Sequence, residues 1–306
     1  MEILKNTNIN FMASRNVGFI VSSICFVLSL FMLLSGLNLG IDFRGGTMIG
    51  LNFSEEVEIQ EVRAAMQSIS IEGQEFDLSA EEIKHFGNNT DIMIKIKTRD
   101  DAPRNFAQGI VNHLYQNMNE KVPDNKNNFI LSIETVGPKV GSELSGKALW
   151  SIISALGLIL FYISIRFEFK FAIGAILALV HDIVITLGIF SLTGYEITLG
   201  TVAAFLTIVG YSLNDTIVIL DRIRENMRSS GTLLFEATIN KSINQSLSRT
   251  LITSLTTLVV IVVLIYAGGE IIRPFAFTML VGVIIGTYSS IYIASGLLAS
   301  VYKSSN

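Results

Sequence analysis

Six long apolar stretches, separated by charged residues, constrain this chain more than any other feature of its sequence. An α-helix needs about 20 residues to cross the roughly 30 Å hydrocarbon core of a bilayer. The stretches lie between Arg15 and Asp42, between Lys147 and Arg166, from Phe171 to about Thr193, from Ile197 to Leu220, between Arg249 and Glu270, and between Arg273 and Lys303. Each is long enough to span, so we predict a polytopic α-helical membrane protein with six transmembrane helices.

The composition agrees with a membrane protein and excludes several other classes. Half of the 306 residues are apolar and only 16% are charged, whereas a soluble globular chain carries about 25% charge. A net charge of -4 shows no basic excess, so we expect no nucleic-acid partner. Cys25 is the single cysteine and cannot form an internal disulfide. The first apolar stretch is too long for a signal peptide and has no small-x-small cleavage site after it, so we expect a retained helix.

The positions of lysine and arginine in the short loops predict the orientation of the spans, because cytoplasmic loops are enriched in these residues. With the N-terminus inside, ten such residues lie inside: Lys5, Arg15, Arg166, Lys170, Arg222, Arg224, Arg228, Lys241, Arg249 and Lys303. In the short outer loops, only Arg273 is positive. We therefore predict that both termini are cytoplasmic.

The predicted organisation follows from these spans. It comprises a cytoplasmic N-terminus over 1–15, a first transmembrane helix over 16–37, a periplasmic domain over 38–146, the five remaining helices of the bundle over 147–302, and a cytoplasmic C-terminus over 303–306. The long loop between the first two spans alternates like a strand over 48–53, 92–97 and 129–135, with a further strand expected within 76–86. Helical patterns cover 55–69 and a segment that starts near Asp101. The order β-α-β-β-α-β predicts one extracytoplasmic ferredoxin-like α/β domain, a fold that by itself identifies no function.

Motifs for enzymatic chemistry are absent or unconvincing. The segment GSELSGK at 141–147 resembles a phosphate-binding loop, but Ala148 replaces the magnesium-binding Ser/Thr, so we interpret it as a glycine-rich loop before the second span. Gly282 and Gly286 form a G-x-x-x-G pattern that would allow close helix approach. His85 and His113 have no partner motif, and we interpret them as surface residues. We expect no enzyme, no cofactor and no metal site.

Ionisable residues within the predicted spans are the strongest functional signal, because buried charges in a bilayer usually face a bundle interior or a water path. His181 and Asp182 lie about eleven residues into the third span, ~16 Å deep. Asn214 and Asp215 lie roughly 9 Å inside the boundary marked by Asp221. Arg249 opens the fifth span from the same side and could meet Asp215 at similar depth. Two interpretations remain open: a static ion pair, or a protonatable carboxylate coupled to helix movement.

Five ordered motifs carry a resemblance that covers nearly the whole chain. They are GIDFRGGT at 40–47, ETVGPKVGSEL at 134–144, ALVHD at 178–182, GYSLNDTIVILDRIREN at 210–226 and SINQSLSRTLITS at 242–254. Together they resemble the SecF branch of the SecD/SecF family of bacterial protein-export subunits, within the resistance-nodulation-division superfamily. The resemblance implies a multi-pass protein of the bacterial cytoplasmic (inner) membrane. It also implies that the proton gradient, rather than a cofactor, is the energy source.

The resemblance further implies partners and site residues. The partners would be SecD, the SecYEG channel, the ATPase SecA and, more widely, YajC and YidC, with an unfolded preprotein as substrate. Asp215 and Arg249 match the proton-pathway positions, and Asn214 stands beside them; His181 and Asp182 match a motif to which the resemblance assigns no role. Two alternatives are half of a small-solute transporter, since a complete pump would have about twelve spans, and a passive membrane scaffold.

Overall fold

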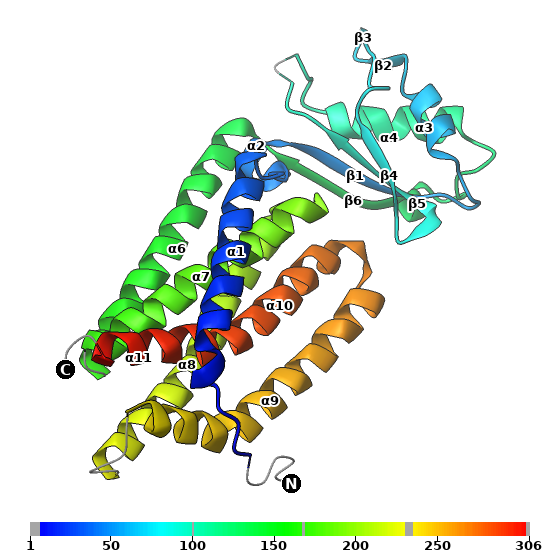
Figure 1. Ribbon diagram of the computed structural model, residues 1–306. Coiled ribbons are helices and arrows are strands. Elements are labelled where there is room, and N and C mark those ends of the chain that lie inside the picture. Colours follow the sequence, from blue (N-terminus) through cyan, green and yellow to red (C-terminus); the bar gives the residue numbers. More distant parts are fainter. Residues whose placement is uncertain (1–6, 100, 167–168, 230–234, 304–306) are drawn as a thin grey trace. The chain divides into compact units, whose positions relative to one another are not determined.

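The computed structural model describes residues 7–99, 101–166, 169–229 and 235–303, without the side chains of 169, 170 and 303. Figure 1 shows a set of long helices and a smaller domain that contains a sheet. The chain divides into two compact units, one formed by Met1–Asn38 with Trp150–Asn306 and the other by Leu39–Leu149. The predicted cytoplasmic ends, 1–15 and 303–306, lie partly outside the described residues.

Six helical segments among the described residues are long and apolar enough to cross a membrane, which confirms the predicted number of spans. They are α1 (Arg15–Leu34) after the short η1 (Met12–Ser14), α6 (Pro138–Arg166), α7 (Phe169–Thr193), α8 (Leu199–Ser229), α9 (Phe235–Ala267), and α10 (Gly269–Ser289), which continues through the π-helix η2 (Ser290–Ala294) into α11 (Ser295–Lys303).

Several helices extend beyond the apolar stretches that predicted them. The second span was expected from Lys147, but α6 already begins at Pro138, and α9 begins at Phe235 rather than at Arg249. Hydropathy marks only the residues that suit the hydrocarbon core, whereas backbone hydrogen bonding continues the helix into polar sequence. The segment 141–147 is therefore helical, and our interpretation of it as a loop was wrong. Its backbone N–H groups are not arranged as a phosphate-binding loop.

Close contact between α8 and α10 organises the interior of the helix bundle. A Cβ atom added at Gly282 would lie 2.2 Å from Cδ1 of Ile208, and one added at Gly286 would lie 2.9 Å from Cβ of Ser212. Only glycine permits this approach, so the predicted role of the G-x-x-x-G pattern in close packing is confirmed. Gly188 of α7 approaches Ser29 of α1 with similar closeness. A Cβ atom added at Gly188 would lie 2.3 Å from Cβ of Ser29.

The smaller unit has the predicted ferredoxin-like arrangement. Its elements are α2 (Ile41–Arg44), β1 (Gly46–Asn52), α3 (Ile59–Ala65), β2 (Ile69–Ile71), β3 (Gln74–Phe76), β4 (Glu82–Phe86), β5 (Asn88–Ile96), α4 (Phe106–Asn117), α5 (Lys126–Phe129) and β6 (Ile130–Val136). The four-stranded sheet has the order β4-β5-β1-β6, and every pairing is antiparallel. The hairpin of β2 and β3 is an addition to the predicted pattern.

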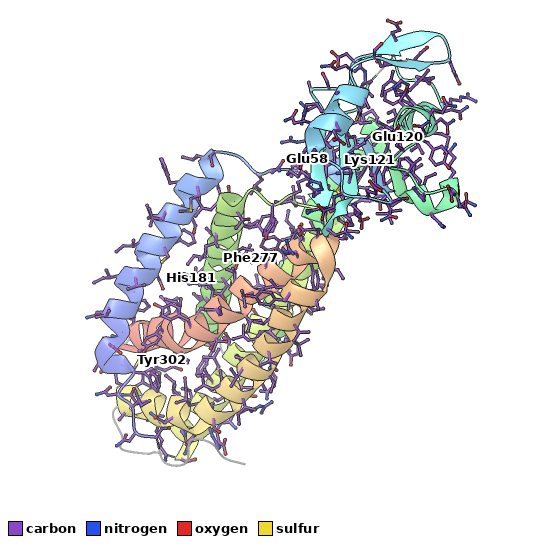
Figure 2. All side chains as sticks on the ribbon, turned by 90° about the vertical axis from the view of Figure 1, so that its right-hand side faces the viewer. Glu58, Glu120, Lys121, His181, Phe277 and Tyr302 are labelled. Carbon is purple, nitrogen blue, oxygen red and sulfur yellow. The ribbon has the colours of Figure 1, made fainter. Side chains whose placement is uncertain are left out.

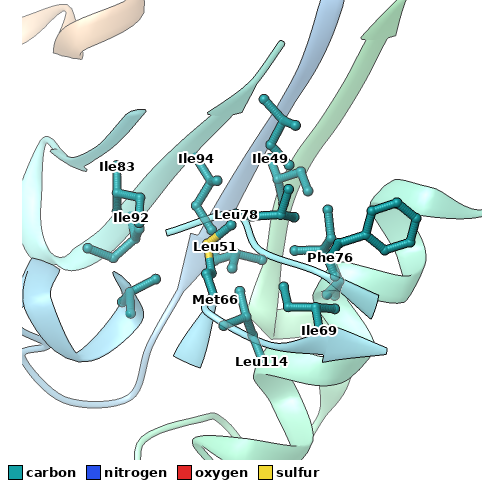
Figure 3. Close-up of a cluster of buried hydrophobic side chains, with 14 of the residues drawn as sticks. Ile49, Leu51, Met66, Ile69, Phe76, Leu78, Ile83, Ile92, Ile94 and Leu114 are labelled. Atoms are coloured by element: carbon teal, nitrogen blue, oxygen red, sulfur yellow. The ribbon is translucent and has the colours of Figure 1, made fainter. Parts of the chain in front are cut away.

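The core of this α/β domain lies between the sheet and the helices α3 and α4, and Figure 3 shows its side chains. Ile49 and Ile94 face each other across β1 and β5 and are fully buried. The helix expected over 55–69 is shorter, since α3 ends at Ala65 and Ile69 belongs to β2. Ile69 is nevertheless buried, as the helical spacing predicted, because β2 continues along the same core. Burial periodicity therefore identified the buried positions but not the end of the helix.

Candidate functional site

Asp215 lies in the interior of the helix bundle and is only 3% exposed. Its Oδ2 atom accepts a long hydrogen bond of 3.5 Å from the hydroxyl of Ser254 on α9. The Ser254 hydroxyl also lies 2.7 Å from that of Thr287 on α10. The carboxylate therefore sits where α8, α9 and α10 meet, with only weak hydrogen bonding to compensate for its burial.

Arg249 is not in contact with Asp215 among the described residues. The two side chains form no ion pair within 4.0 Å in that part of the chain, and Arg249 is exposed on the surface of α9. Sequence position alone places the two residues at similar depth, but the rotation of α9 about its axis decides whether the side chains touch. A direct pair would require the long arginine side chain to swing towards α8.

Asn214 points away from the buried carboxylate, although it is its neighbour in sequence. It is exposed on α8, in line with Ala203, Thr207 and Gly210, which are also exposed. These four residues follow the spacing i, i+4, i+7, i+11 and therefore form one stripe of small or polar residues along the helix. The structure thus separates Asn214 from Asp215 and places it on an outward-facing surface, which we call the α8 stripe.

Asp182 is the centre of a second, more completely bonded cluster. Its side chain is fully buried, and His181 Nδ1 lies 2.9 Å from its Oδ1 atom. Its Oδ2 atom accepts hydrogen bonds from the hydroxyls of Ser212 on α8, at 2.5 Å, and Ser289 on α10, at 2.7 Å. Figure 2 labels His181 among the membrane helices. The cluster connects α7, α8 and α10, and three groups bond to one carboxylate.

Ser212 and Ser289 were not predicted as site residues. A serine in a membrane helix gives no strong signal by itself, because its hydroxyl can bond to the carbonyl one turn earlier in its own helix. One signal was available in the helix periodicity. Ser289 lies on the same helix face as Gly282 and Gly286, at the spacing i, i+4, i+7, and Ser212 precedes Asp215 by one turn on the same face of its helix. Hydroxyls on the faces where helices approach most closely are the ones that can reach a neighbouring helix.

The remaining polar residues that the structure describes form no cluster suited to a metal ion. No group of three or more His, Cys, Asp or Glu side chains suited to a metal occurs within the described ranges. His113 Nε2 lies 3.1 Å from the carbonyl of Ala65, in the α/β domain. His85 is half-buried on β4 and also belongs to that domain.

Together, these features define a multi-pass membrane protein whose helix bundle encloses ionisable groups, an arrangement typical of proteins that move ions or protons. The family described as "Protein export membrane protein SecD/SecF, C-terminal" matches residues 115–304. The model described as "SecD/SecF GG Motif" matches residues 31–57. The chain therefore belongs to the SecD/SecF family, and its relatives place it with the SecF protein translocase subunits.

Those relatives are similar over almost their whole length. A protein translocase subunit SecF from Calditerrivibrio nitroreducens is 46% identical over 304 residues, covering 97% of this chain and 96% of the relative. One from Vibrio alginolyticus is 41% identical over 295 residues, covering 93% of this chain and 90% of the relative. Both names denote a transport component rather than an enzyme.

A solved structure shows the same fold. The crystal structure of SecDF, described as a translocon-associated membrane protein, from Thermus thermophilus superposes with a TM-score of 0.82 at 35% identity and covers 99% of this chain. SecDF in a super-membrane-facing form superposes with a TM-score of 0.71. This chain spans 40% of the SecDF chain in both cases.

Proposed function

We propose that this chain pairs with SecD and that the pair uses the proton-motive force to promote the late stages of preprotein translocation. Asp215 is the group that binds and releases the proton, and Arg249 is its charge partner. The observation that carries the proposal is the burial of Asp215 with no lysine or arginine paired to it among the described residues. A buried carboxylate is costly to keep ionised unless it is paired, so its charge state and the approach of Arg249 depend on each other.

The orientation in the bacterial inner membrane rests on the lysine and arginine count. Ten of these residues lie in the short segments assigned to the cytoplasm, against Arg273 alone in the short loops assigned to the periplasm. The α/β domain is then periplasmic, and α8 runs from the periplasmic towards the cytoplasmic side. Protons driven by the gradient would enter from the periplasmic end of α8.

The α8 stripe supports the pairing with SecD. Asn214 lies in the middle of a membrane-spanning helix yet is exposed, and a polar side chain facing lipid is unfavourable. Small residues such as Ala203 and Gly210 along the same line allow another helix to approach closely. A second helix bundle seated on this stripe would cover Asn214 and supply the missing half of a transporter-like assembly. The similarity to two fifths of SecDF agrees with this arrangement.

The energy of the proton gradient is sufficient for a mechanical role. One proton crossing 100 mV releases about 2.3 kcal/mol before any pH gradient is added. Loss of charge on Asp215 would remove its attraction to Arg249 and free α8 and α9 to move relative to each other. The periplasmic domain would hold and release the exported chain. Its outer strands, β4 and β6, have edges to which an extended peptide can add as a further strand.

The wider machinery follows from the same proposal. SecA would push the preprotein through the SecYEG channel, and the SecD pair would act on the part that has emerged. YajC and YidC would be accessory partners in the same membrane. Purification from native membranes, with identification of the subunits recovered, tests this list. Full activity of the lone chain in proteoliposomes would contradict the need for SecD.

The central test replaces Asp215 by asparagine, which retains the shape but not the titratable charge. Asp215→Asn should insert and assemble normally but lose the part of export that depends on the proton gradient. Arg249→Met should lose the same part, because the charge that attracts the Asp215 carboxylate is gone. The matched control is Asp221→Asn on the same helix, because Asp221 forms only a partly exposed ion pair with Arg166 at 3.2 Å.

The measurements are protein abundance, assembly with the second subunit, and export with and without the gradient. A well-assembled Asp215→Asn complex that still responds to the gradient would refute the proposed role. A static ion pair would give another pattern, in which abundance or assembly falls and the surviving complex responds normally. The Asp221→Asn control should match the wild type in all three measurements.

A further inference from the structure

The Asp182 cluster has no part in the function proposed above, yet it is the most completely buried ionisable site in the described helix bundle. Asp182 and Ser289 are each 0% exposed, and Ser212 is 1% exposed. A buried carboxylate without hydrogen bonds would be strongly unfavourable, and here three donors surround it. Burying a carboxylate costs free energy that apolar side chains at the same positions would not, so we expect this cluster to have a role beyond packing.

We propose that Asp182 is a second proton-binding site, upstream of Asp215, and that Ser289 changes its hydrogen-bond acceptor when the proton binds. This inference rests on the proposed function, because it places both carboxylates on one proton path. The proton comes from water on the periplasmic side, binds to Oδ2 of Asp182, and leaves towards Asp215. No bond other than O–H is formed or broken.

Ser289 has two acceptors within reach of its hydroxyl. The Oγ atom lies 2.7 Å from Oδ2 of Asp182 and 3.2 Å from the carbonyl oxygen of Gly286. When Asp182 is ionised, Ser289 donates to the carboxylate. When Oδ2 carries the proton, that O–H donates to Ser289, whose own hydrogen then turns to Gly286. Both states satisfy every hydroxyl, so the cluster can accept a proton without leaving a buried donor unpaired.

Ser212 connects the two carboxylates along α8. It bonds to Asp182, and it precedes Asp215 by three residues, which places the two levels ~4.5 Å apart along the helix axis. Residues three apart lie on the same face of a helix. With α8 running towards the cytoplasm, Asp182 is at the level that an inward-moving proton reaches first.

Within the described residues, no lysine or arginine pairs with Asp182 to hold it in its ionised form. The titratable groups in the membrane-spanning middle of the elements packed around it are, within the described residues, His181 on α7, Tyr211 and Asp215 on α8, Tyr288 on α10, Tyr292 on η2 and Cys25 on α1. No lysine or arginine occurs there in the part of the chain that the structure describes. The charge of Asp182 therefore depends on its hydrogen-bond donors, one of which can turn away.

His181 provides a polar route into the cluster. Its Nδ1 atom bonds to Asp182, while its Nε2 atom is buried without a partner in the described chain. The hydroxyls of Thr186 on α7 and Tyr211 on α8 are likewise buried without partners there. Buried polar groups in proteins are nearly always hydrogen-bonded, with water as a frequent partner. Buried polar atoms of this kind on α7 and α8 are what a proton path through a bundle needs.

The position of Ser289 couples proton binding to helix geometry. Ser289 is the last residue of α10 and directly precedes the π-helix η2. Local π-helical turns are common at functional sites, because their backbone is less regular than that of an α-helix. Proton binding at Asp182 therefore reverses the hydrogen bond between α7 and α10 at this junction and turns the Ser289 hydrogen to a carbonyl of its own helix.

The test is infrared difference spectroscopy of the chain, purified with its accompanying subunit, in lipid nanodiscs over a range of pH. A protonated buried carboxyl group gives a C=O stretching band that an ionised one lacks. Asp182 and Asp215 should each give such a band, and we expect the Asp182 band to disappear in Asp182→Asn and to remain in Asp215→Asn. In Ser289→Ala the band should persist to higher pH, because the ionised form loses a donor.

The matched control is Ser290→Ala. Ser290 is as buried as Ser289, but its hydroxyl donates to the carbonyl of Thr287 within the same helical segment, at 3.0 Å. The control should leave the band and its pH dependence unchanged. Equal shifts in both serine variants would overturn the assignment, because they would indicate a general packing effect.

The inference and the proposed function can fail separately. If every carboxyl band were unaffected by Asp182→Asn and by Ser289→Ala, the inference would be overturned, even if Asp215→Asn abolished gradient-dependent export. If the band followed Asp182 and Ser289 but export ignored the gradient, the proton site would stand and the proposed function would fall. Because Ser289→Ala retains Asp182, a folding defect in Asp182→Asn does not remove the test.

Discussion

Gly282 of α10 lies directly against Ile208 of α8, and changing the size of each side chain should reveal how strongly this contact supports the bundle. Gly282→Ala would place a Cβ atom 2.2 Å from Cδ1 and 2.7 Å from Cγ2 of Ile208. Carbon atoms pack at about 3.5–4.0 Å, so Ile208 would have to move by more than about 1 Å. Ile208 is 1% exposed and has little room to do so.

The expected cost follows from this crowding. Overpacking of a well-packed core costs about 1–3 kcal/mol, so Gly282→Ala should weaken the folded bundle by roughly that amount. Ile208→Ala alone removes buried methyl groups and should cost about 2–5 kcal/mol. In the double variant the new methyl group occupies space that Ile208 has vacated. The two effects should therefore not add, and we expect a favourable coupling of about 1–3 kcal/mol.

Equilibrium unfolding of the full chain in lipid bicelles measures the four stabilities of this double-mutant cycle. The control is Gly157→Ala on α6, because a Cβ atom there meets nothing within 4 Å. It reports the intrinsic gain from replacing glycine by alanine in a helix, which is up to about 1 kcal/mol. Additive effects of the two substitutions, after correction by this control, would refute the argument that Gly282 and Ile208 are in direct steric contact.

Two further predictions concern other parts of the molecule. Gly210→Leu on the α8 stripe should reduce the amount of SecD that copurifies, whereas the control Gly157→Leu should not. In the chain alone, both new side chains would enter open space, so neither should disturb the fold. Equal recovery of SecD with both variants would contradict a docking role for the stripe. In the α/β domain, hydrogen bonds from the side chain and backbone of Ser79 lower the pKa of Asp77. The ionised Asp77 carboxylate stabilises the fold fully at a pH above its pKa in the unfolded chain. This stabilisation is lost as the pH falls through the lower pKa that Asp77 has in the folded protein. Asp77→Asn should therefore make the protection of the Ser79 amide against hydrogen exchange less sensitive to acid, and an unchanged pH dependence would count against the assignment.

The sequence alone determined the features that depend on the surrounding solvent. Apolar stretches must be long enough for the bilayer, so the six spans could be read directly. Alternation with a period of two and the order of the elements identified the ferredoxin-like domain, and the observed strand order β4-β5-β1-β6 agrees with it. Counting residues also predicts the depth of Asp182 and Asp215 within their spans, and this depth stays a prediction.

Only the tertiary structure decided which side chains meet, because that depends on how each helix is rotated and which neighbour it packs against. Asn214 and Asp215 are adjacent in sequence, yet one is exposed and the other is buried. Ser289 is more than one hundred residues from Asp182 in sequence but donates to its carboxylate, because α7 and α10 pack against each other. A helical pattern fixes one face of one helix. The contacts of that face with other helices are a property of the folded bundle.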